Sequence, residues 1–364
     1  MNSMLEEVLA REGTAPVFED TRVDAELEEM LSKMRTNIKI IGIGGGGCNT
    51  IGRIYNEGIV GADLYAANTD AQHLLHITAP KKVLLGRRIT KGLGAGALPQ
   101  IGEEAAREAE EELRGILQGS DIVFVTCGLG GGTGTGGSGY VARIAKELGA
   151  LTIAVVTLPF RGEGKLRMES AEWGLDRLRD AADTVITIPN DKLLDLVPRM
   201  SLNLAFKFAD EVLMRSIKGL TEIITKPGLV NLDFNDVKTI MKGGGVAMIG
   251  LGESQAMGEN RAHEAIEEAV NSPLLEVDVS SAHGVLINVT GGNDMTIAEA
   301  ERVAEVVQEK VSPTARIIWG ATVDPSLEHT LRVMLVATGV RSKQIVGRRD
   351  PAEERARVGV DVIR

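Results

Sequence analysis

Aromatic residues are scarce in this sequence, and their scarcity excludes one class of function. Phe, Trp and Tyr together make up 3% of the 364 residues, too few for the stacking surface on which single-stranded nucleic acids bind. Acidic residues outnumber basic ones, and the formal net charge of −11 disfavours attraction to the phosphate backbone of DNA or RNA. We therefore expect no nucleic-acid partner.

Cysteine and long apolar runs are also in short supply. The two cysteines, Cys48 and Cys127, cannot supply a zinc site or a disulfide framework, and we expect both to be small buried thiols. No run of about 18 apolar residues is present, and the N-terminus is acidic where a signal peptide would be basic and apolar. The sequence thus predicts no membrane insertion, no metal held by protein side chains, and a cytoplasmic location.

Glycine, in contrast, is abundant and gathers in two loops. Of the 43 glycines, one group lies in residues 42–47, directly after an apolar segment, and a second lies in residues 128–137, after another. Glycine lets backbone N–H groups come close to an anion, and a helix N-terminus adds partial positive charge. Two such loops, the second with hydroxyls at Thr133 and Thr135, predict a phosphate chain held from two sides.

From residue 38 onward, apolar segments alternate with helical patterns. Strands are expected at 38–43, 63–67, 121–126, 151–157 and 184–188, and helices at 49–57, 100–118, 138–148, 166–181 and 201–224. This alternation is typical of a Rossmann-like parallel sheet covered by helices on both faces. A smaller α/β domain should follow the long helix, with strands near 245–251, 284–290, 315–321 and 330–338 and helices near 235–242, 259–270 and 296–310.

We divide the chain into five parts. These are an acidic flexible arm at 1–36, a nucleotide-binding domain at 37–200, a central helix at 201–225, a C-terminal domain at 226–340 and a flexible tail at 341–364. The arm holds nine acidic and four basic residues, with one short amphipathic helix expected near its end.

The first glycine loop taken alone would suit a nicotinamide oxidoreductase. Residues 42–47 read Gly-x-Gly-x-x-Gly, and Asp63 or Asp70 lies about 20 residues later, as in the dinucleotide fingerprint. An oxidoreductase gives no reason for the second loop, and none of the five histidines stands in a recognisable catalytic setting. A P-loop NTPase is disfavoured because Gly-x-x-x-x-Gly-Lys-Ser/Thr does not occur.

The second loop and five further motifs resemble the tubulin/FtsZ superfamily, and FtsZ in particular. The matching segments are Gly128–Gly136, Gly44–Asn49, Asn68–Gln72, Gly92–Gly96, Ile188–Asn190 and Asn231–Asp236. The resemblance spans about residues 37–340, and the acidic arm with Cys48 indicates an archaeal-type member. It implies a GTPase that polymerises head to tail into filaments of a cell-division ring. Residues 37–200 would bind GTP, and residues 226–340 would serve activation and polymerisation.

The resemblance also implies which residues bind GTP or GDP. The phosphate loops comprise Gly45, Gly46, Gly47, Cys48 and Asn49, then Gly130, Gly131, Gly132, Thr133, Gly134, Thr135 and Gly136, with Asp70, Gly94, Ala95 and Gly96 between them. Mg²⁺ would be bound through the phosphates.

At the other end of the nucleotide, Glu163 and Arg167 match the positions that hold the ribose and neighbouring groups. A surface-helix charge pair is the alternative. Asn190 and Asp210 match guanine and ribose contacts, with Phe206 either beside the base or in the helix core. A carboxylate at 210 can accept from both the ring N–H and the exocyclic amine of guanine, a donor pair that adenine lacks.

Asp233 and Asp236 are the residues that the resemblance implies for hydrolysis. They lie three apart at the start of an expected helix, so both can point the same way, although acidic residues in a first turn are also ordinary caps. A filament protein or adaptor without hydrolytic activity is disfavoured because both are present. If Asp210 touches guanine, the helix from there to Thr225 spans about 22 Å. The two carboxylates should therefore act on the GTP of a neighbouring subunit, through a head-to-tail interface that does not close.

The tail 341–364 is either a docking segment or a solvated end. It holds seven basic and four acidic residues and finishes in Val358-Gly-Val-Asp-Val-Ile. The valines alternate at strand spacing, which suits addition to the edge of a partner's sheet. In FtsZ proteins the extreme C-terminus commonly reaches a membrane-linking adaptor, so the resemblance implies such a partner and a location at the division site. The segment departs from the usual bacterial C-terminal peptide.

Overall fold

The computed structural model describes residues 36–196, 201–226, 228–230, 232–256, 260–275 and 279–340. The helix expected within 1–36 and the tail 341–364 lie outside these residues.

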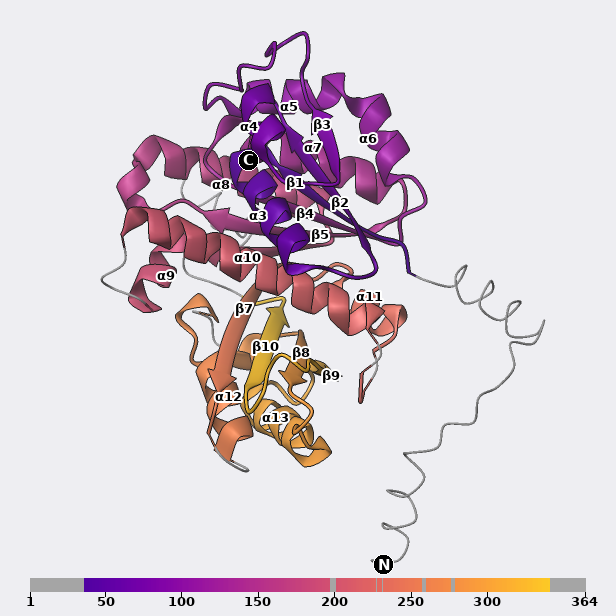
Figure 1. Ribbon diagram of the computed structural model, residues 1–364, viewed down its shortest axis with the longest axis vertical. Coiled ribbons are helices and arrows are strands. Elements are labelled where there is room, and N and C mark those ends of the chain that lie inside the picture. Colours follow the sequence, from indigo (N-terminus) through magenta and orange to yellow (C-terminus); the bar gives the residue numbers. More distant parts are fainter. Residues whose placement is uncertain are drawn as a thin grey trace, which may run out of the picture. The chain divides into compact units, whose positions relative to one another are not determined.

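Within the described residues, a ten-stranded sheet has the order β3-β2-β1-β4-β5-β6-β7-β10-β8-β9 (Figure 1). The first six strands are parallel: β1 Ile38–Ile43, β2 Ala62–Asn68, β3 Lys81–Leu84, β4 Ile122–Gly128, β5 Leu151–Leu158 and β6 Thr184–Pro189. The remaining strands are β7 Gly245–Ser254, β8 Gly284–Gly291, β9 Arg316–Val323 and β10 Leu331–Thr338. β7 pairs parallel with β6, and β10 runs antiparallel between β7 and β8.

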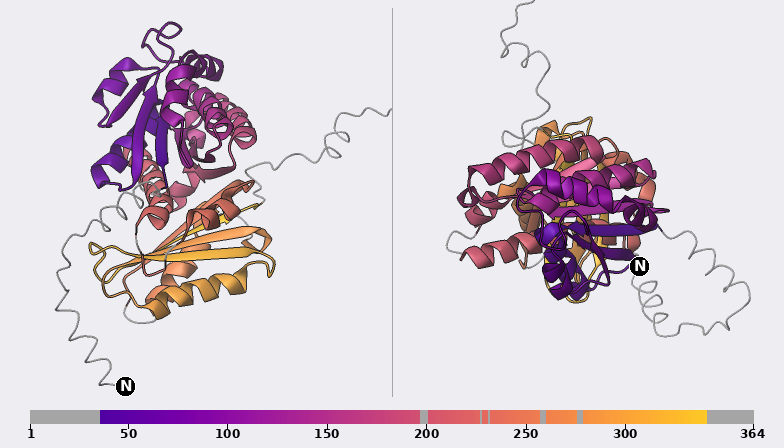
Figure 2. Two further views of the ribbon diagram at one scale, coloured as in Figure 1. Left: turned by 90° about the vertical axis from the view of Figure 1, so that its right-hand side faces the viewer. Right: turned by 90° about the horizontal axis from the view of Figure 1, so that it is seen from above.

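Helices cover both faces of the sheet, as predicted (Figure 2). α3 Gly44–Glu57, α4 Ala71–His76, α9 Asn190–Leu196, α10 Leu202–Thr225 and α11 Phe234–Met241 pack on one hydrophobic cluster. α5 Pro99–Glu108, α6 Glu110–Leu117, α7 Gly132–Glu147, α8 Lys165–Ala181, α12 Asn260–Val270 and α13 Ile297–Lys310 pack on the other.

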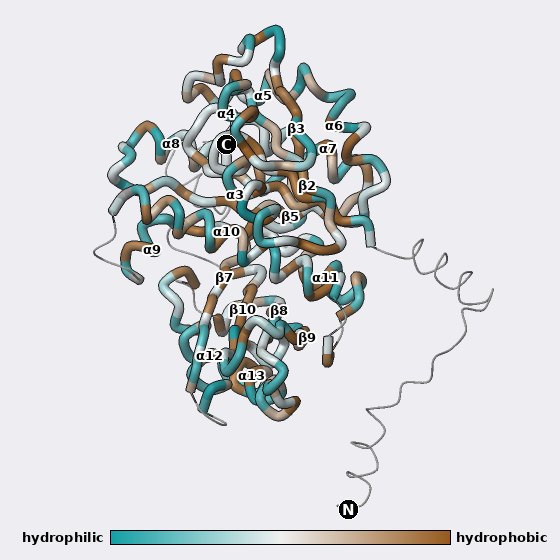
Figure 3. The backbone as a smooth tube through the Cα atoms, viewed as in Figure 1, coloured by the Kyte–Doolittle hydropathy of each residue, from teal (hydrophilic) through white to brown (hydrophobic). Residues whose placement is uncertain are grey.

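The two hydrophobic clusters lie on opposite faces of the sheet, because successive side chains of a strand point to opposite faces. In β1, Ile38 and Ile40 belong to the first cluster and Ile41 and Ile43 to the second. Figure 3 shows hydrophobic residues concentrated on the strands. None of the helices within the described ranges is long and apolar enough to cross a membrane.

The predicted elements differ from the observed ones in several places. β3, α4 and α9 were not predicted because each is short and lacks a clear apolar period. The helix expected at 100–118 is broken at Ala109, which has φ −93° and ψ 14° and follows no sequence signal. α3 and α7 begin at Gly44 and Gly132, several residues earlier than predicted, because glycine is a poor helix former and hides the helical pattern.

The strand order reverses beside the two glycine loops. From β1 the chain passes to β2 on one side, whereas β4, on the other side of β1, leads outward to β5. In open parallel sheets, ligands bind outside the carboxyl ends of the strands where the order reverses in this way. α3 begins directly after β1, and α7 begins shortly after β4, so both helix N-termini lie at this point.

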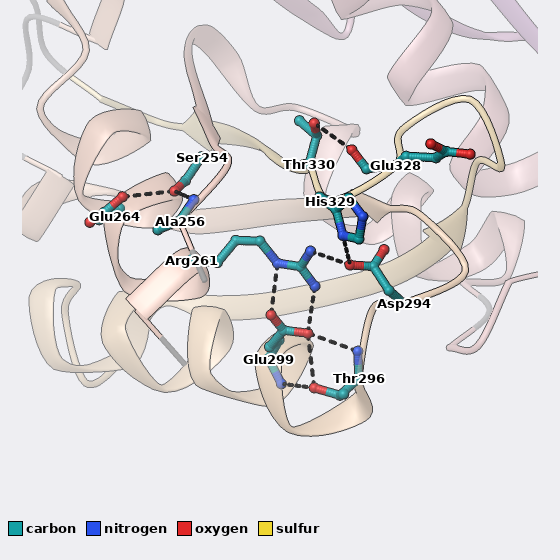
Figure 4. Close-up of polar contacts among 10 residues, drawn as sticks. All are labelled: Ser254, Ala256, Arg261, Glu264, Asp294, Thr296, Glu299, Glu328, His329 and Thr330. Atoms are coloured by element: carbon teal, nitrogen blue, oxygen red, sulfur yellow. Dashed lines mark hydrogen bonds and ion pairs between the residues drawn. The ribbon is translucent and has the colours of Figure 1, made fainter. Parts of the chain in front are cut away.

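In the C-terminal half, a buried ion pair ties α12 to α13 (Figure 4). Arg261 on α12, which is 5% exposed, donates to Glu299 through Nε at 2.8 Å and Nη2 at 3.0 Å, and through Nη1 to Asp294 at 2.6 Å. Glu299 also accepts from the Thr296 amide and completes a capping box at the start of α13. Burial alone would raise the pKa of Glu299, but the hydrogen bonds from Arg261 and Thr296 lower it below its usual value.

Candidate functional site

The two glycine loops lie against each other. A Cβ placed on Gly44 would be 2.8 Å from the Gly134 nitrogen, and one on Gly46 would be 3.2 Å from the Gly128 nitrogen. Gly44 also has φ +73°, a conformation that side chains disfavour. The N-termini of α3 and α7 therefore meet closely enough for one anionic group to contact both.

Two glycines of these loops have no structural need to be glycine. At Gly45 and at Gly131, an added Cβ would meet nothing within 4 Å. Gly131 has φ −91° and ψ 172°, an extended conformation that any residue adopts. Such open positions beside helix N-termini let a ligand approach the N–H groups closely.

The loop that carries Gly94, Ala95 and Gly96 closes over the second glycine loop. A Cβ on Gly132 would be 2.9 Å from both the Cβ of Ala95 and the nitrogen of Leu98. The Gly94 amide donates to the Thr69 carbonyl at 3.2 Å. Gly94 and Gly96 themselves have open space beside them. The structure thus brings these predicted phosphate-loop segments together in one place.

The two threonines of the second loop already have partners within the protein. The Thr133 and Thr69 hydroxyl oxygens lie 2.6 Å apart, which links the second loop to the segment after β2. The Gly130 amide donates to the Thr135 hydroxyl at 2.8 Å, and Thr135 is fully buried. Thr135 therefore shapes the loop from behind, and phosphate contact by these hydroxyls stays a prediction.

Cys48, Asn49 and Asp70 are placed differently from one another. The Cys48 side chain is buried with its Sγ 3.5 Å from the Ala67 carbonyl, and burial raises the pKa of its thiol to about 12. Only the main chain of Cys48 can therefore face a phosphate, whereas Asn49 is exposed on the same turn. Asp70 accepts from the His73 amide at 2.9 Å and caps α4.

Glu163 and Arg167 lie beside the second loop. They form an ion pair at 3.0 Å, and Glu163 also accepts from the Phe160 amide at 2.9 Å. A Cβ on Gly130 would be 2.8 Å from the Cγ of Arg167. The charge pair that we gave as the alternative to a ribose contact is therefore present. A contact of these two residues with the ribose stays a prediction.

The residues predicted at the base offer one unsatisfied group and one exposed ring. Asn190 is 4% exposed, and its Oδ1 has no hydrogen-bond partner among the described residues. A buried amide oxygen without a partner is costly, so this atom is suited to a ligand donor. Phe206 is 39% exposed and packs edge to face on Phe160 at 5.2 Å between ring centroids, so it does not belong to the helix core.

Asp210 lies one turn beyond Phe206 on α10. Burial raises the pKa of its carboxyl to about 6, although the neighbouring Arg53 guanidinium opposes this shift. Arg53 Nε is 3.6 Å from the Asp210 carboxylate. Arg53 could not be singled out from the sequence, because its contact with Asp210 depends on how α3 packs against α10.

Asp233 and Asp236 lie at the other end of α10. The loop before them is fixed to β9, since the Leu229 amide donates to the Ala321 carbonyl at 2.8 Å and the Ala321 amide donates to Val230 at 3.2 Å. Asp233 is exposed, and its Oδ1 accepts from the Asp236 amide at 2.9 Å, so it does cap α11. The structure does not bring these carboxylates to the glycine loops, because α10 is one unbroken helix from Leu202 to Thr225.

Metal-binding side chains are not gathered at this site. Over the described ranges, no group of three or more His, Cys, Asp or Glu residues could hold a metal ion. The glycine loops at the starts of α3 and α7 instead offer backbone N–H groups, which suit an anion.

The sequence matches two domains of one family. Residues 37–198 match the Tubulin/FtsZ family GTPase domain, and residues 245–341 match the FtsZ family C-terminal domain. The chain is 58% identical to "Cell division protein FtsZ 1" of Archaeoglobus fulgidus over the full length of both. It is 50% identical to the protein of the same name from Thermococcus kodakarensis, over 100% of this chain and 99% of that one.

Solved structures agree with these matches. The "FtsZ dimer, empty" of M. jannaschii has a TM-score of 0.84 and 55% identity, over 88% of this chain and 93% of that one. CetZ2 from Haloferax volcanii, at 22% identity, has a TM-score of 0.74 over 89% and 98% of the two chains, which shows a shared fold.

Proposed function

We propose that this chain, which belongs to the FtsZ family, assembles head to tail into filaments and hydrolyses GTP at each junction between subunits. Membership rests on the two family domains and on relatives of 50–58% identity over the whole chain. The chain is accordingly a cell-division GTPase. The observation that supports the shared-site proposal is that Asp210 lies in the first half of the unbroken helix α10, whereas Asp233 follows its far end.

GTP would be held by the groups gathered at the predicted nucleotide site. The N–H groups at the starts of α3 and α7 suit its phosphates, because both helix dipoles favour negative charge there. Asn190 and Asp210 would bind guanine, with the unpaired Asn190 oxygen accepting from the base. Mg²⁺, when bound through the phosphates, would neutralise the charge that develops during transfer.

The carboxylates would act on the nucleotide of the next subunit. Thr225 lies about 22 Å along α10 from Asp210, and the chain continues beyond it to Asp233. We infer that Asp233 and Asp236 do not act on the nucleotide bound in their own subunit. Stacked head to tail, the exposed Asp233 of one subunit would face the predicted nucleotide site of the next. There the two carboxylates would orient and polarise the water that attacks the γ-phosphate.

Exposed leucines support such a contact. Leu93 and Leu166, beside the predicted nucleotide site, are 86% and 81% exposed, and Leu229, in the loop before Asp233, is 50% exposed. In the proposed head-to-tail contact these exposed side chains would be covered, and their burial would contribute to association. Because the two surfaces differ, repeated association produces an open filament.

One sedimentation experiment tests this function. The protein is spun with GTP, GDP or NAD while phosphate release is followed in parallel. We expect pelleted polymer and phosphate release with GTP, and no response to NAD. Tighter binding of NAD than of GTP, or phosphate release without assembly, would contradict the proposal.

The tail 341–364 would link these filaments to a membrane through an adaptor at a division ring. The support is its alternating valines and its basic residues, which suit a partner's sheet edge. Deletion of residues 341–364 should leave hydrolysis and assembly intact in vitro while the protein loses its position in cells. Rings at the division site formed by the truncated protein would show that the tail is only a solvated end.

A further inference from the structure

Arg53 joins the helix of the first phosphate loop to the helix that carries Asp210. Its Nε lies 3.6 Å from Asp210 Oδ2, and its Nη1 lies 3.9 Å from Glu211 Oε2. The Asp210 side chain is 18% exposed and that of Arg53 is 32% exposed. The contact is therefore partly shielded from water, where a charge pair is stronger than on an open surface.

Guanine recognition needs the Asp210 carboxylate in its ionised form. Guanine presents two donors, the ring N–H and the exocyclic amine, and a carboxylate can accept from both. A protonated carboxyl group would bring a third donor to the same place. Burial favours that protonated form, and the positive charge of Arg53 opposes it.

The other charged groups on the elements around Asp210 do not contact its carboxylate among the described residues. On α10, Glu211 lies between two arginines, 2.8 Å from Arg215 and 3.9 Å from Arg53, so it shares Arg53 with Asp210. Lys207 is exposed to solvent. On α9, Lys192 pairs with Asp195 at 3.7 Å. β5 carries no titratable side chain, and α3 offers Glu57 besides Arg53. Among the described residues, Arg53 is thus the cation that contacts Asp210.

We propose that Arg53 is a positioning residue for guanine recognition, which keeps the Asp210 carboxylate ionised and directed at the base. This inference rests on the proposed binding of guanine by Asp210. Arg53 lies two turns along α3 from Gly45, about 12 Å away. The same helix therefore carries the predicted first phosphate loop and the arginine that would orient the Asp210 carboxylate toward guanine.

The ratio of the affinities for GDP and IDP measures this role directly. The two ligands carry identical phosphates, so phosphate ionisation cancels, and IDP lacks only the exocyclic amine. With Asp210 ionised, we expect a ratio of about ten or more from one charge-assisted hydrogen bond. The ratio should fall towards one below about pH 6, as Asp210 takes up a proton. Calorimetric titration of the full chain with each ligand from pH 5 to pH 8 gives the midpoint, which is the pH at which the affinity ratio has fallen halfway.

Four variants separate the possible results. In Arg53→Met the midpoint should rise by about one pH unit, whereas Arg53→Lys should stay near wild type. Arg215→Met removes an arginine of the same cluster that pairs with Glu211 and should leave the midpoint unchanged. Asp210→Asn cannot ionise and should give a low ratio at every pH. Circular dichroism checks that each variant is folded.

Two outcomes overturn the inference in distinguishable ways. A midpoint in folded Arg53→Met equal to that of wild type would refute the role of Arg53 and leave guanine binding by Asp210 intact. Equal ratios for wild type and Asp210→Asn at all pH values would refute the guanine contact itself, and with it this part of the proposed function.

Discussion

Gly131 is the residue at which a substitution tests the predicted phosphate-binding loops most selectively. Its extended backbone accepts a β-branched side chain, and the space beside it is open. Gly131→Val should therefore fold normally yet weaken GTP binding by at least about tenfold, or 1.4 kcal/mol, because the side chain occupies the path of the phosphates. Equilibrium titration with GTP measures the loss.

Gly115 on α6 provides the matched control. An added Cβ there also meets nothing within 4 Å, so Gly115→Val should leave GTP affinity unchanged. Equal affinity in Gly131→Val and wild type would show that the phosphates do not pass this glycine. Gly132 is the poorer choice, because a side chain there would push against Ala95 and Leu98 and displace a whole loop.

Individual residues also show which features of the site cannot be predicted from the sequence. The two glycine loops, Asn190 and Asp210 could be singled out from motifs alone. The sequence could not show that Thr135 is fully buried and holds the Gly130 amide, or that the Cys48 thiol points into the core. Arg53 carried no signal because a contact between two helices depends on how they pack, which no spacing within one helix reveals.

At the scale of elements, the packing of α12 against α13 depends on the buried ion pair of Arg261. Arg261→Met leaves the buried Glu299 without its partner, and removal of one member of a buried ion pair typically costs about 3–5 kcal/mol. We expect a loss of that size in the free energy of unfolding, measured by urea denaturation.

Arg302 on α13 serves as the control for this loss. It pairs with Glu305 at 2.9 Å, and both side chains are more than half exposed. Arg302→Met should therefore change the free energy of unfolding by less than about 1 kcal/mol. Equal effects of the two substitutions would mean that the Arg261 contacts add nothing beyond an ordinary surface pair.

Elements were predictable where the apolar period was long. The 24-residue α10 was predicted to within one residue at each end, and β7 was predicted from its first residue but three residues too short. β3 was missed because its four residues read Lys-Lys-Val-Leu with the lysines exposed, as is common for a strand at the edge of a sheet. The starts of α3 and α7 were missed because the glycines that suit a phosphate also mask a helix.

At the scale of the whole molecule, Asp236 is a cleaner probe of the proposed shared site than Asp233. Asp233 also caps α11, so its removal would cost about 1 kcal/mol of stability. Among the described residues, no cap by the Asp236 side chain is found. Asp236→Ala should keep GTP binding and filament formation but lose hydrolysis by about 100-fold or more, measured as phosphate release.

The neighbouring Asn235 gives the control for this variant. It is exposed on the same turn and carries no carboxylate, so Asn235→Ala should hydrolyse GTP at the wild-type rate. Similar losses in both variants would point to a disturbed helix and not to a missing carboxylate.

The dependence of GTP hydrolysis on protein concentration tests the central claim most directly. Phosphate release per subunit is measured over a dilution series while sedimentation velocity reports the size of the particles in the same samples. If the active site is shared, hydrolysis per subunit is near zero while the protein is monomeric and rises with assembly. Hydrolysis by demonstrably monomeric protein at the rate of the assembled sample would contradict the account.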